Sequence, residues 1–117
     1  MYTEGKMMPV TDKMLEEMTR KIVETVNPRQ VVLFGSRARN DAHAASDVDF
    51  LVVEDEPFGP KRSRRKEMAR LWRALSGFDV AKDILVYAFE EVERWRHSRS
   101  HVIAHALRHG RILYERS

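Results

Sequence analysis

Two aspartates at the start of an apolar run are the first residues in this chain whose types and spacing could do chemistry. Asp47 and Asp49 stand two positions apart, so on a strand both carboxylates point to one face, roughly 6.6 Å apart along the chain. Two carboxylates held about 6 Å apart repel by roughly 2 to 3 kcal/mol at an effective dielectric near 20, and a cation between them relieves this repulsion. Because all the ligands would be oxygens, the pattern favours Mg²⁺ or Mn²⁺.

A glycine–serine corner precedes the two aspartates. Residues 31–34 form a short apolar run of the β type that stops at Gly35 and Ser36 and passes into a helix-favouring segment with Arg37 and Arg39. Glycine lets another group approach the backbone, and a serine at a helix start leaves amides and a hydroxyl facing outward. Such a corner is an anion site. Beside the dicarboxylate, it predicts a site for a metal-bound nucleotide phosphate.

A third carboxylate is needed if two metal ions are to activate an attacking hydroxyl and clamp the leaving pyrophosphate. Asp83 lies at the head of a second apolar run, residues 83–87, much as Asp49 precedes residues 50–53. Asp79 is the rival, but four residues along a strand is about 13 Å, so both cannot serve the same metals. We select Asp83.

These residues suggest a division of roles. Asp47 and Asp49 would ligate both metals, while Asp83 would hold the catalytic metal and accept the proton of the acceptor hydroxyl. The predicted triphosphate ligands are the corner and the two arginines that follow it, Gly35, Ser36, Arg37 and Arg39.

The elements that must position this site follow from apolar periodicity and breakers. The predicted order is a helix over residues 11–27, strands over 30–34 and 47–53 that run antiparallel, a helix through 68–75, a strand over 80–87, a helix from 88, a last helix ending at Gly110 and a strand over 111–115. We expect an α/β fold, a small mixed sheet of three to four strands with helices packed against one face.

Length and composition restrict the number of domains, the kinds of metal site and the expected location of this protein. The 117 residues predict one domain, residues 1–117, with a loose leader over 1–10. The absence of cysteine excludes a disulfide framework and thiolate metal sites. No apolar stretch reaches membrane-spanning length and no signal-peptide core is present, so we expect a cytoplasmic protein without membrane association.

Three further features remain open from sequence alone. Residues 61–66 place five cations in six positions, which fits either a solvated loop and helix turn or a nucleic-acid contact. Trp72 and Trp95 fall on apolar stripes and are predicted to be core anchors rather than stacking surfaces for bases. Four histidines recur every four residues and could hold zinc or simply border an apolar face: His97, His101, His105 and His109.

The motifs resemble a known superfamily. Residues 35–39 and 46–52, Gly-Ser-Arg-Ala-Arg and Ser-Asp-Val-Asp-Phe-Leu-Val, are similar to the signature of polymerase-beta-type nucleotidyltransferases, and the short chain resembles their minimal nucleotidyltransferase (MNT) branch. The resemblance implies the polymerase-beta-like fold, the third acid on a neighbouring strand, two Mg²⁺ ions and ATP as the donor. One departure is Asn40, where the family usually has glycine; asparagine tolerates the left-handed backbone conformation that such a turn needs.

The same resemblance implies a partner. Many MNT proteins are antitoxins paired with a helical HEPN-type RNase toxin, to which they transfer AMP on a tyrosine. Our leading hypothesis is therefore a Mg²⁺-dependent adenylyltransferase antitoxin, which a homo- or hetero-oligomer would suit. The alternatives are a non-catalytic module that caps its partner, or a nucleotidyltransferase acting on a small molecule or on an RNA end.

Overall fold

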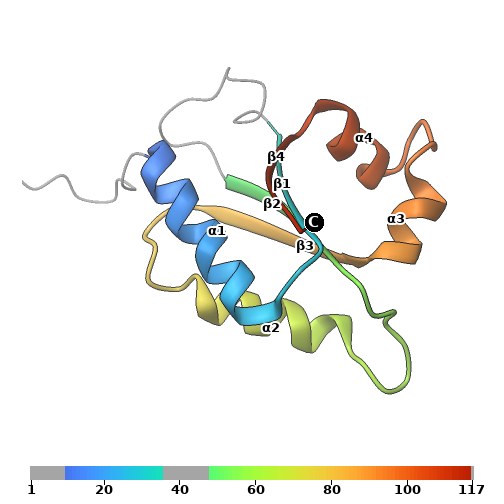
Figure 1. Cartoon of the computed structure of the whole chain (residues 1–117), viewed down its shortest axis with the longest axis horizontal. Helices are drawn as coiled ribbons and strands as arrows, with labels where there is room; N and C mark the ends of the chain where they lie inside the picture. The colour runs from blue at the N-terminus through green and yellow to red at the C-terminus, as the bar shows by residue number, and fades with distance from the viewer. Residues whose placement is uncertain (1–9, 36–47, 117) are drawn as a thin grey trace, which may run out of the picture.

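The computed structural model describes residues 10–35 and 48–116. These residues form four helices and four strands (Figure 1). In chain order the elements are α1 (Asp12–Val26), β1 (Gln30–Phe34), β2 (Val48–Glu54), α2 (Arg64–Ala74), β3 (Lys82–Ala88), α3 (Phe89–Trp95), α4 (Val102–His109) and β4 (Arg111–Glu115). The predicted order of elements is confirmed, although β3 begins two residues later than expected.

Capping residues fix the ends of α1. The Thr11 hydroxyl accepts a hydrogen bond from the Met14 amide (3.1 Å), which satisfies one of the free N–H groups at the helix start. At the other end Asn27 adopts a left-handed conformation (φ 47°) just before Pro28, a residue that disfavours helix in its predecessor. Between these caps the apolar side of the helix is buried at Leu15, Met18 and Ile22.

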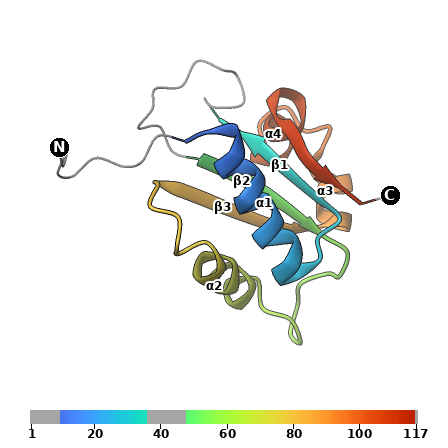
Figure 2. The same ribbon diagram turned by 60° about the vertical axis from the view of Figure 1, so that its left-hand side comes forward.

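The four strands form one mixed sheet in the order β3-β2-β1-β4. β1 pairs antiparallel with both β2 and β4, whereas β2 and β3 run parallel. The antiparallel return from β1 to β2 and the mixed character of the sheet were predicted and are confirmed. Figure 2 shows the strands side by side beneath α1.

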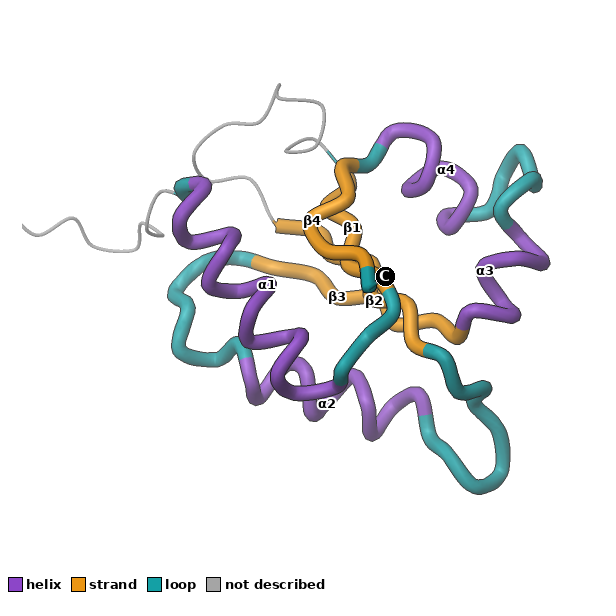
Figure 3. The backbone as a smooth tube through the Cα atoms, in the orientation of Figure 1, coloured by secondary structure: helices purple, strands orange, loops and turns teal. Residues whose placement is uncertain are grey.

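Helices cover both faces of this sheet, so the expectation that they pack on one face is wrong. α1 and α2 pack on the face that carries Phe50 and Val52, and α3 and α4 pack on the face that carries Leu51 and Val53 (Figures 1 and 3). The physical reason is that β2 is apolar on both sides, with Val48 and every residue from Phe50 to Glu54 buried. A strand without alternation needs cover on both faces.

The prediction that both tryptophans anchor the core is also wrong. Trp72 and Trp95 each expose 39% of their surface. Trp72 lies at the margin of the buried side of α2, and the Trp95 ring stacks on His101 (centroids 4.6 Å apart) rather than entering the core.

Among the described residues, no helix is long and apolar enough to cross a membrane.

Candidate active site

Asp49 and Asp83 lie opposite each other on adjacent strands. In the parallel ladder between β2 and β3 they are register partners, so their backbones are about 4.8 Å apart. Side chains alternate along a strand, and Phe50 and Ile84 both belong to the core under α1 and α2. The two carboxylates therefore share the opposite face, and that they ligate the same metal stays a prediction.

Asp79 does not share this position. It precedes β3, which begins at Lys82, and its side chain is exposed. Asp83 is also exposed, and its Oδ1 accepts a hydrogen bond from the Ile84 amide (3.0 Å). This bond fixes the carboxylate near the strand and leaves Oδ2 for a further ligand.

Gly35 approaches the Asp49 carboxylate closely. Phe34, the last residue of β1, pairs with Asp49, and Gly35 follows with a positive φ of 79°. A Cβ added at Gly35 would overlap Asp49 Oδ2 and lie 3.2 Å from its Cγ. Both the backbone conformation and the contact require glycine here, so the corner is packed against one of the predicted metal ligands.

The other predicted site residues lie outside the described residues. They are Ser36, Arg37, Arg39 and Asp47, and the atypical Asn40 is in the same segment. Asp49, Asp83 and Gly35 are thus the predicted residues that the structure brings together. Within the described ranges no group of three or more acidic or histidine side chains could hold a metal ion.

The paired carboxylates fit a hard divalent cation in their donor chemistry. Both offer oxygen ligands, which Mg²⁺ and Mn²⁺ prefer. The Gly35 backbone lies directly against the Asp49 carboxylate, so no residue with a Cβ fits there. The site lies at the end of the sheet where β2 and β3 begin. α3 starts at Phe89, directly after the opposite end of β3. At that opposite end the Phe89 ring centroid lies 3.8 Å from the guanidinium carbon of Arg29, which precedes β1.

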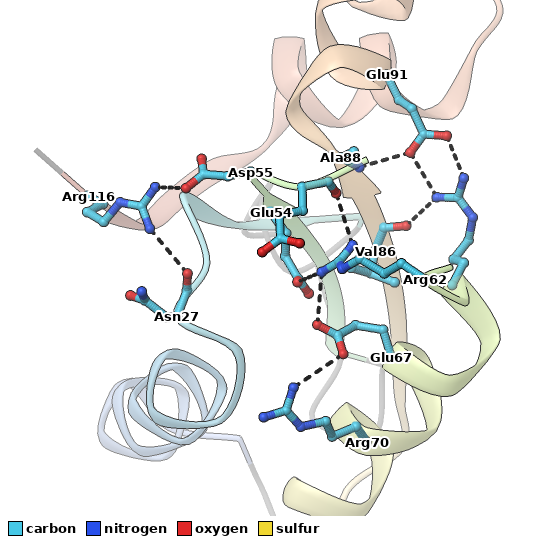
Figure 4. Close-up of polar contacts among 12 residues, drawn as sticks. Asn27, Glu54, Asp55, Arg62, Glu67, Arg70, Val86, Ala88, Glu91 and Arg116 are labelled. Atoms are coloured by element: carbon cyan, nitrogen blue, oxygen red, sulfur yellow. Dashed lines mark hydrogen bonds and ion pairs between the residues drawn. The ribbon is translucent and has the colours of Figure 1, made fainter. Parts of the chain in front are cut away.

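Two of the five cations in residues 61–66 are held by internal partners, Arg62 and Arg64. Figure 4 shows Arg62 between Glu54 and Glu67. Arg64 binds the Glu91 carboxylate (3.1 Å from Nη1) and the Val86 carbonyl oxygen (2.7 Å), which ties α2 to β3 and α3. Burial alone would raise the pKa of Glu91, but the hydrogen bonds from Arg64 and from the Ala88 amide outweigh it and lower that pKa.

Arg62 joins two acids, one of them buried. It bonds to Glu54 at the end of β2 and to Glu67 on α2 (3.3 Å), and Glu67 also contacts Arg70 (3.4 Å). Glu54 is 4% exposed, and its Oε2 is buried without a hydrogen-bond partner among the described residues. Burial, followed by the neighbouring Glu67 carboxylate, raises the pKa of Glu54 to about 8. Glu54 was not predicted from the sequence, although an acid ending a buried strand eight positions before Arg62 was a usable signal.

The four histidines do not share one helix. α3 ends at Trp95 and α4 begins at Val102, so His97 lies between the two. His101 is the N-cap of α4, where its Nδ1 accepts a hydrogen bond from the Ile103 amide (3.1 Å). His105 and His109 remain as neighbours on α4, with ring centroids 4.8 Å apart. This arrangement favours a structural role over a zinc site.

The comparison with protein families identifies the family of this chain. The profile of the family described as "Nucleotidyltransferase domain" matches residues 13–109. This chain belongs to the nucleotidyltransferase domain family. The match spans α1 to α4, including Gly35, Asp49 and Asp83. A comparison with curated protein sequences found no match.

Solved structures share the fold of this nucleotidyltransferase domain. A candidate nucleotidyltransferase from Sulfolobus solfataricus is 21% identical with a TM-score of 0.62, over 89% of this chain and 79% of the other. A toxin–antitoxin structure with AMP-PNP is 22% identical with a TM-score of 0.52, over 87% of this chain and 74% of the other. A MntA–HpeT toxin–antitoxin mutant, with two aspartates two positions apart changed to glutamate, is 18% identical with a TM-score of 0.53 and the same coverage.

A cavity elsewhere in the domain does not belong to the carboxylate site. It has a volume of about 540 Å³ and lies between α1 and β4, where Leu15, Thr19 and Tyr114 line it. Leu15 and Tyr114 belong to the core on the face opposite Asp49 and Asp83. This cavity is therefore separate from the carboxylate pair.

Proposed function

We propose that this nucleotidyltransferase domain transfers AMP from ATP to a hydroxyl group of a partner protein, using Mg²⁺. The observation that carries the proposal is the register pairing of Asp49 with Asp83 beside Gly35, in a chain of the nucleotidyltransferase domain family. The spacing of Asp47 and Asp49 equals that of the two aspartates changed in the MntA–HpeT mutant.

In this proposal each residue has one task. Asp47, Asp49 and Asp83 hold the divalent ions, which when bound stabilise the charge on the transferred phosphate and on the pyrophosphate. The acceptor oxygen forms a bond to the α-phosphorus of ATP, the bond to pyrophosphate breaks, and Asp83 takes the hydroxyl proton. The backbone at Gly35 and Ser36, with Arg37 or Arg39, binds the β- and γ-phosphates of the donor.

A partner protein is proposed as the acceptor because the described residues leave no layer to bind one. All four helices pack on the sheet, two on each face, and the site lies at the open sheet end. Two structural neighbours are toxin–antitoxin complexes, one of them with an ATP analogue. Together with the MNT resemblance, this supports an antitoxin whose acceptor is a tyrosine of a HEPN-type RNase toxin.

The test is incubation with α-³²P-labelled ATP and Mg²⁺, with and without the candidate toxin. Four forms of the assay are compared: wild type, Asp47→Asn/Asp49→Asn, the matched control Asp12→Asn/Asp79→Asn, and the toxin alone. We expect label on the toxin with wild type and control, and at least about a 1,000-fold lower rate with the site variant, as for loss of the main charge-stabilising ligands.

Two outcomes would overturn this function. If the toxin stays unlabelled while the two proteins co-purify and the site variant still neutralises the toxin, the domain acts by capping. If label appears on RNA ends or on a small molecule and never on the toxin, the acceptor class is wrong.

A further inference from the structure

The solvent face of α2 is a basic surface that the transfer site does not use. Lys66, Ala69, Arg70 and Arg73 recur at spacings of three and four residues, so they project together from one side of the helix. This side is opposite the buried Leu71. With Arg62, Ser63 and Glu67 these residues line a hollow of about 370 Å³, and the small Ala69 leaves room between the cationic side chains.

The segment around α2 is strongly positive. Residues 57–78 contain seven Lys and Arg side chains and a single acid, Glu67, whereas the rest of the chain has more acids than cations. Glu67 is already bonded to Arg62 and Arg70. Four of the cations are exposed and pair with no acid among the described residues: Lys61, Arg65, Lys66 and Arg73.

The position of these cations on the helix carries a cost. Arg65 and Lys66 stand in the first turn of α2, after the N-cap Ser63, where the helix dipole disfavours positive charge by some tenths of a kcal/mol each. Negative groups bound along this face would offset that cost. Phosphates suit the site, because arginine recognises them through paired N–H donors.

An exposed aromatic ring lies on the flank of the same face. Trp72 exposes 39% of its surface, and helical spacing places it next to Ala69, with Arg65 one turn further along the same side. The Lys82 ammonium lies 5.5 Å from its ring centroid, so the ring is oriented by a cation on one side. Exposed aromatic rings beside a row of cations are the combination by which proteins bind unpaired bases and their backbone.

We propose that the solvent face of α2 binds single-stranded nucleic acid, with Lys66, Arg70 and Arg73 on phosphates and Trp72 stacked on a base. α2 packs on the sheet face opposite Asp49 and Asp83, so this binding is separate from nucleotidyl transfer and does not rest on it. An acidic protein surface would satisfy the cations but would make no use of the tryptophan.

The test is fluorescence anisotropy with a fluorescein-labelled 20-nucleotide single-stranded RNA between 50 and 300 mM KCl. Each phosphate contact on a single strand contributes about −0.7 to the slope of log K against log salt. Lys66→Gln/Arg70→Gln/Arg73→Gln should therefore make the slope shallower by about 2 and weaken binding at least tenfold at 50 mM KCl. The matched control Lys13→Gln/Arg20→Gln/Lys21→Gln removes the same charge from exposed positions of α1 and should keep the wild-type slope.

A second variant separates stacking from charge. Trp72→Leu should weaken binding about tenfold at every salt concentration without changing the slope, since base stacking is worth about 1 to 3 kcal/mol. Circular dichroism confirms that each variant is folded. The proposal is overturned if wild type does not bind the RNA at 50 mM KCl, if both triple variants lose binding equally, or if a duplex of the same length binds more tightly.

Discussion

Replacing Glu54 by glutamine should stabilise this protein at alkaline pH and leave its stability near pH 5 almost unchanged. The Glu54 side chain is buried at the end of β2 between Arg62 and Glu67. Glutamine has the same shape as a protonated glutamate: its carbonyl can accept the bond from Arg62 and its amide can donate to Glu67. The variant therefore imitates the neutral acid at every pH.

The magnitude follows from the pKa of Glu54. Burial and the neighbouring Glu67 raise the pKa from its ordinary value of 4.5 to about 8 in the folded protein. Between these values the folded state binds more protons than the unfolded state, so the free energy of unfolding falls as pH rises from 4.5 to 8 and levels off above 8. At about 1.4 kcal/mol per pH unit the loss is on the order of 3 to 5 kcal/mol.

The assay is urea unfolding followed by circular dichroism at several pH values between 5 and 8.5. Groups that titrate in both proteins contribute equally and cancel in the difference. We therefore expect the free energy of unfolding of Glu54→Gln to exceed that of wild type by about 2 kcal/mol or more at pH 8.5. Asp55→Asn is the control. Hydrogen bonds from Arg116 and Arg29 lower the pKa of exposed Asp55, so its contribution is lost only as pH falls through the acidic range and stays constant from pH 5 to 8.5.

Parallel pH profiles would refute the raised pKa of Glu54. If wild type and Glu54→Gln lose or keep stability together from pH 5 to 8.5, folding does not change the pKa of Glu54. A variant that is less stable than wild type by a constant amount across this range would lead to the same conclusion.

Three other substitutions test single contacts. Gly35→Ala places a Cβ on the Asp49 carboxylate at a positive φ, so AMP transfer should fall at least about 100-fold; a wild-type rate would contradict the close approach. Arg64→Met leaves Glu91 without its guanidinium partner and should lower the free energy of unfolding by about 2 kcal/mol in urea, whereas a change below about 0.5 kcal/mol would show that the pair is dispensable. Thr11→Ala should lower the free energy of unfolding in urea by about 1 kcal/mol, because the N-cap hydrogen bond is lost. Thr11→Ser should retain this bond and the wild-type stability.

The elements with strong local signals were predicted well from the sequence. The ends of α1 follow from the hydroxyl of Thr11 and from Asn27 before proline, and both residues cap the helix in the structure. β1 and β4 were placed at their observed bounds, and the end of α4 at Gly110 agrees with the structure. Capping and breaking are local effects, so the sequence alone is sufficient to locate them.

Properties that depend on packing between distant segments were not accessible in the same way. The parallel pairing of β2 with β3, which sets Asp83 opposite Asp49, is a register between strands that are separated by α2. α3 and α4 were both predicted, but the expectation that all helices lie on one face was wrong, because which face a helix covers depends on packing against distant strands. Trp72 was misplaced because a ring at the margin of an apolar stripe has the same helical spacing as a core residue.

The measurement that tests the central claim most directly is Mn²⁺ binding by electron paramagnetic resonance in the presence of a non-hydrolysable ATP analogue. Wild type is compared with Asp49→Asn, Asp83→Asn and the control Asp79→Asn, each of which removes one negative charge. If Asp49 and Asp83 form one metal site across the β2–β3 ladder, both site variants should lose bound Mn²⁺ while Asp79→Asn retains it. Retention by Asp83→Asn together with loss by Asp79→Asn would contradict the account.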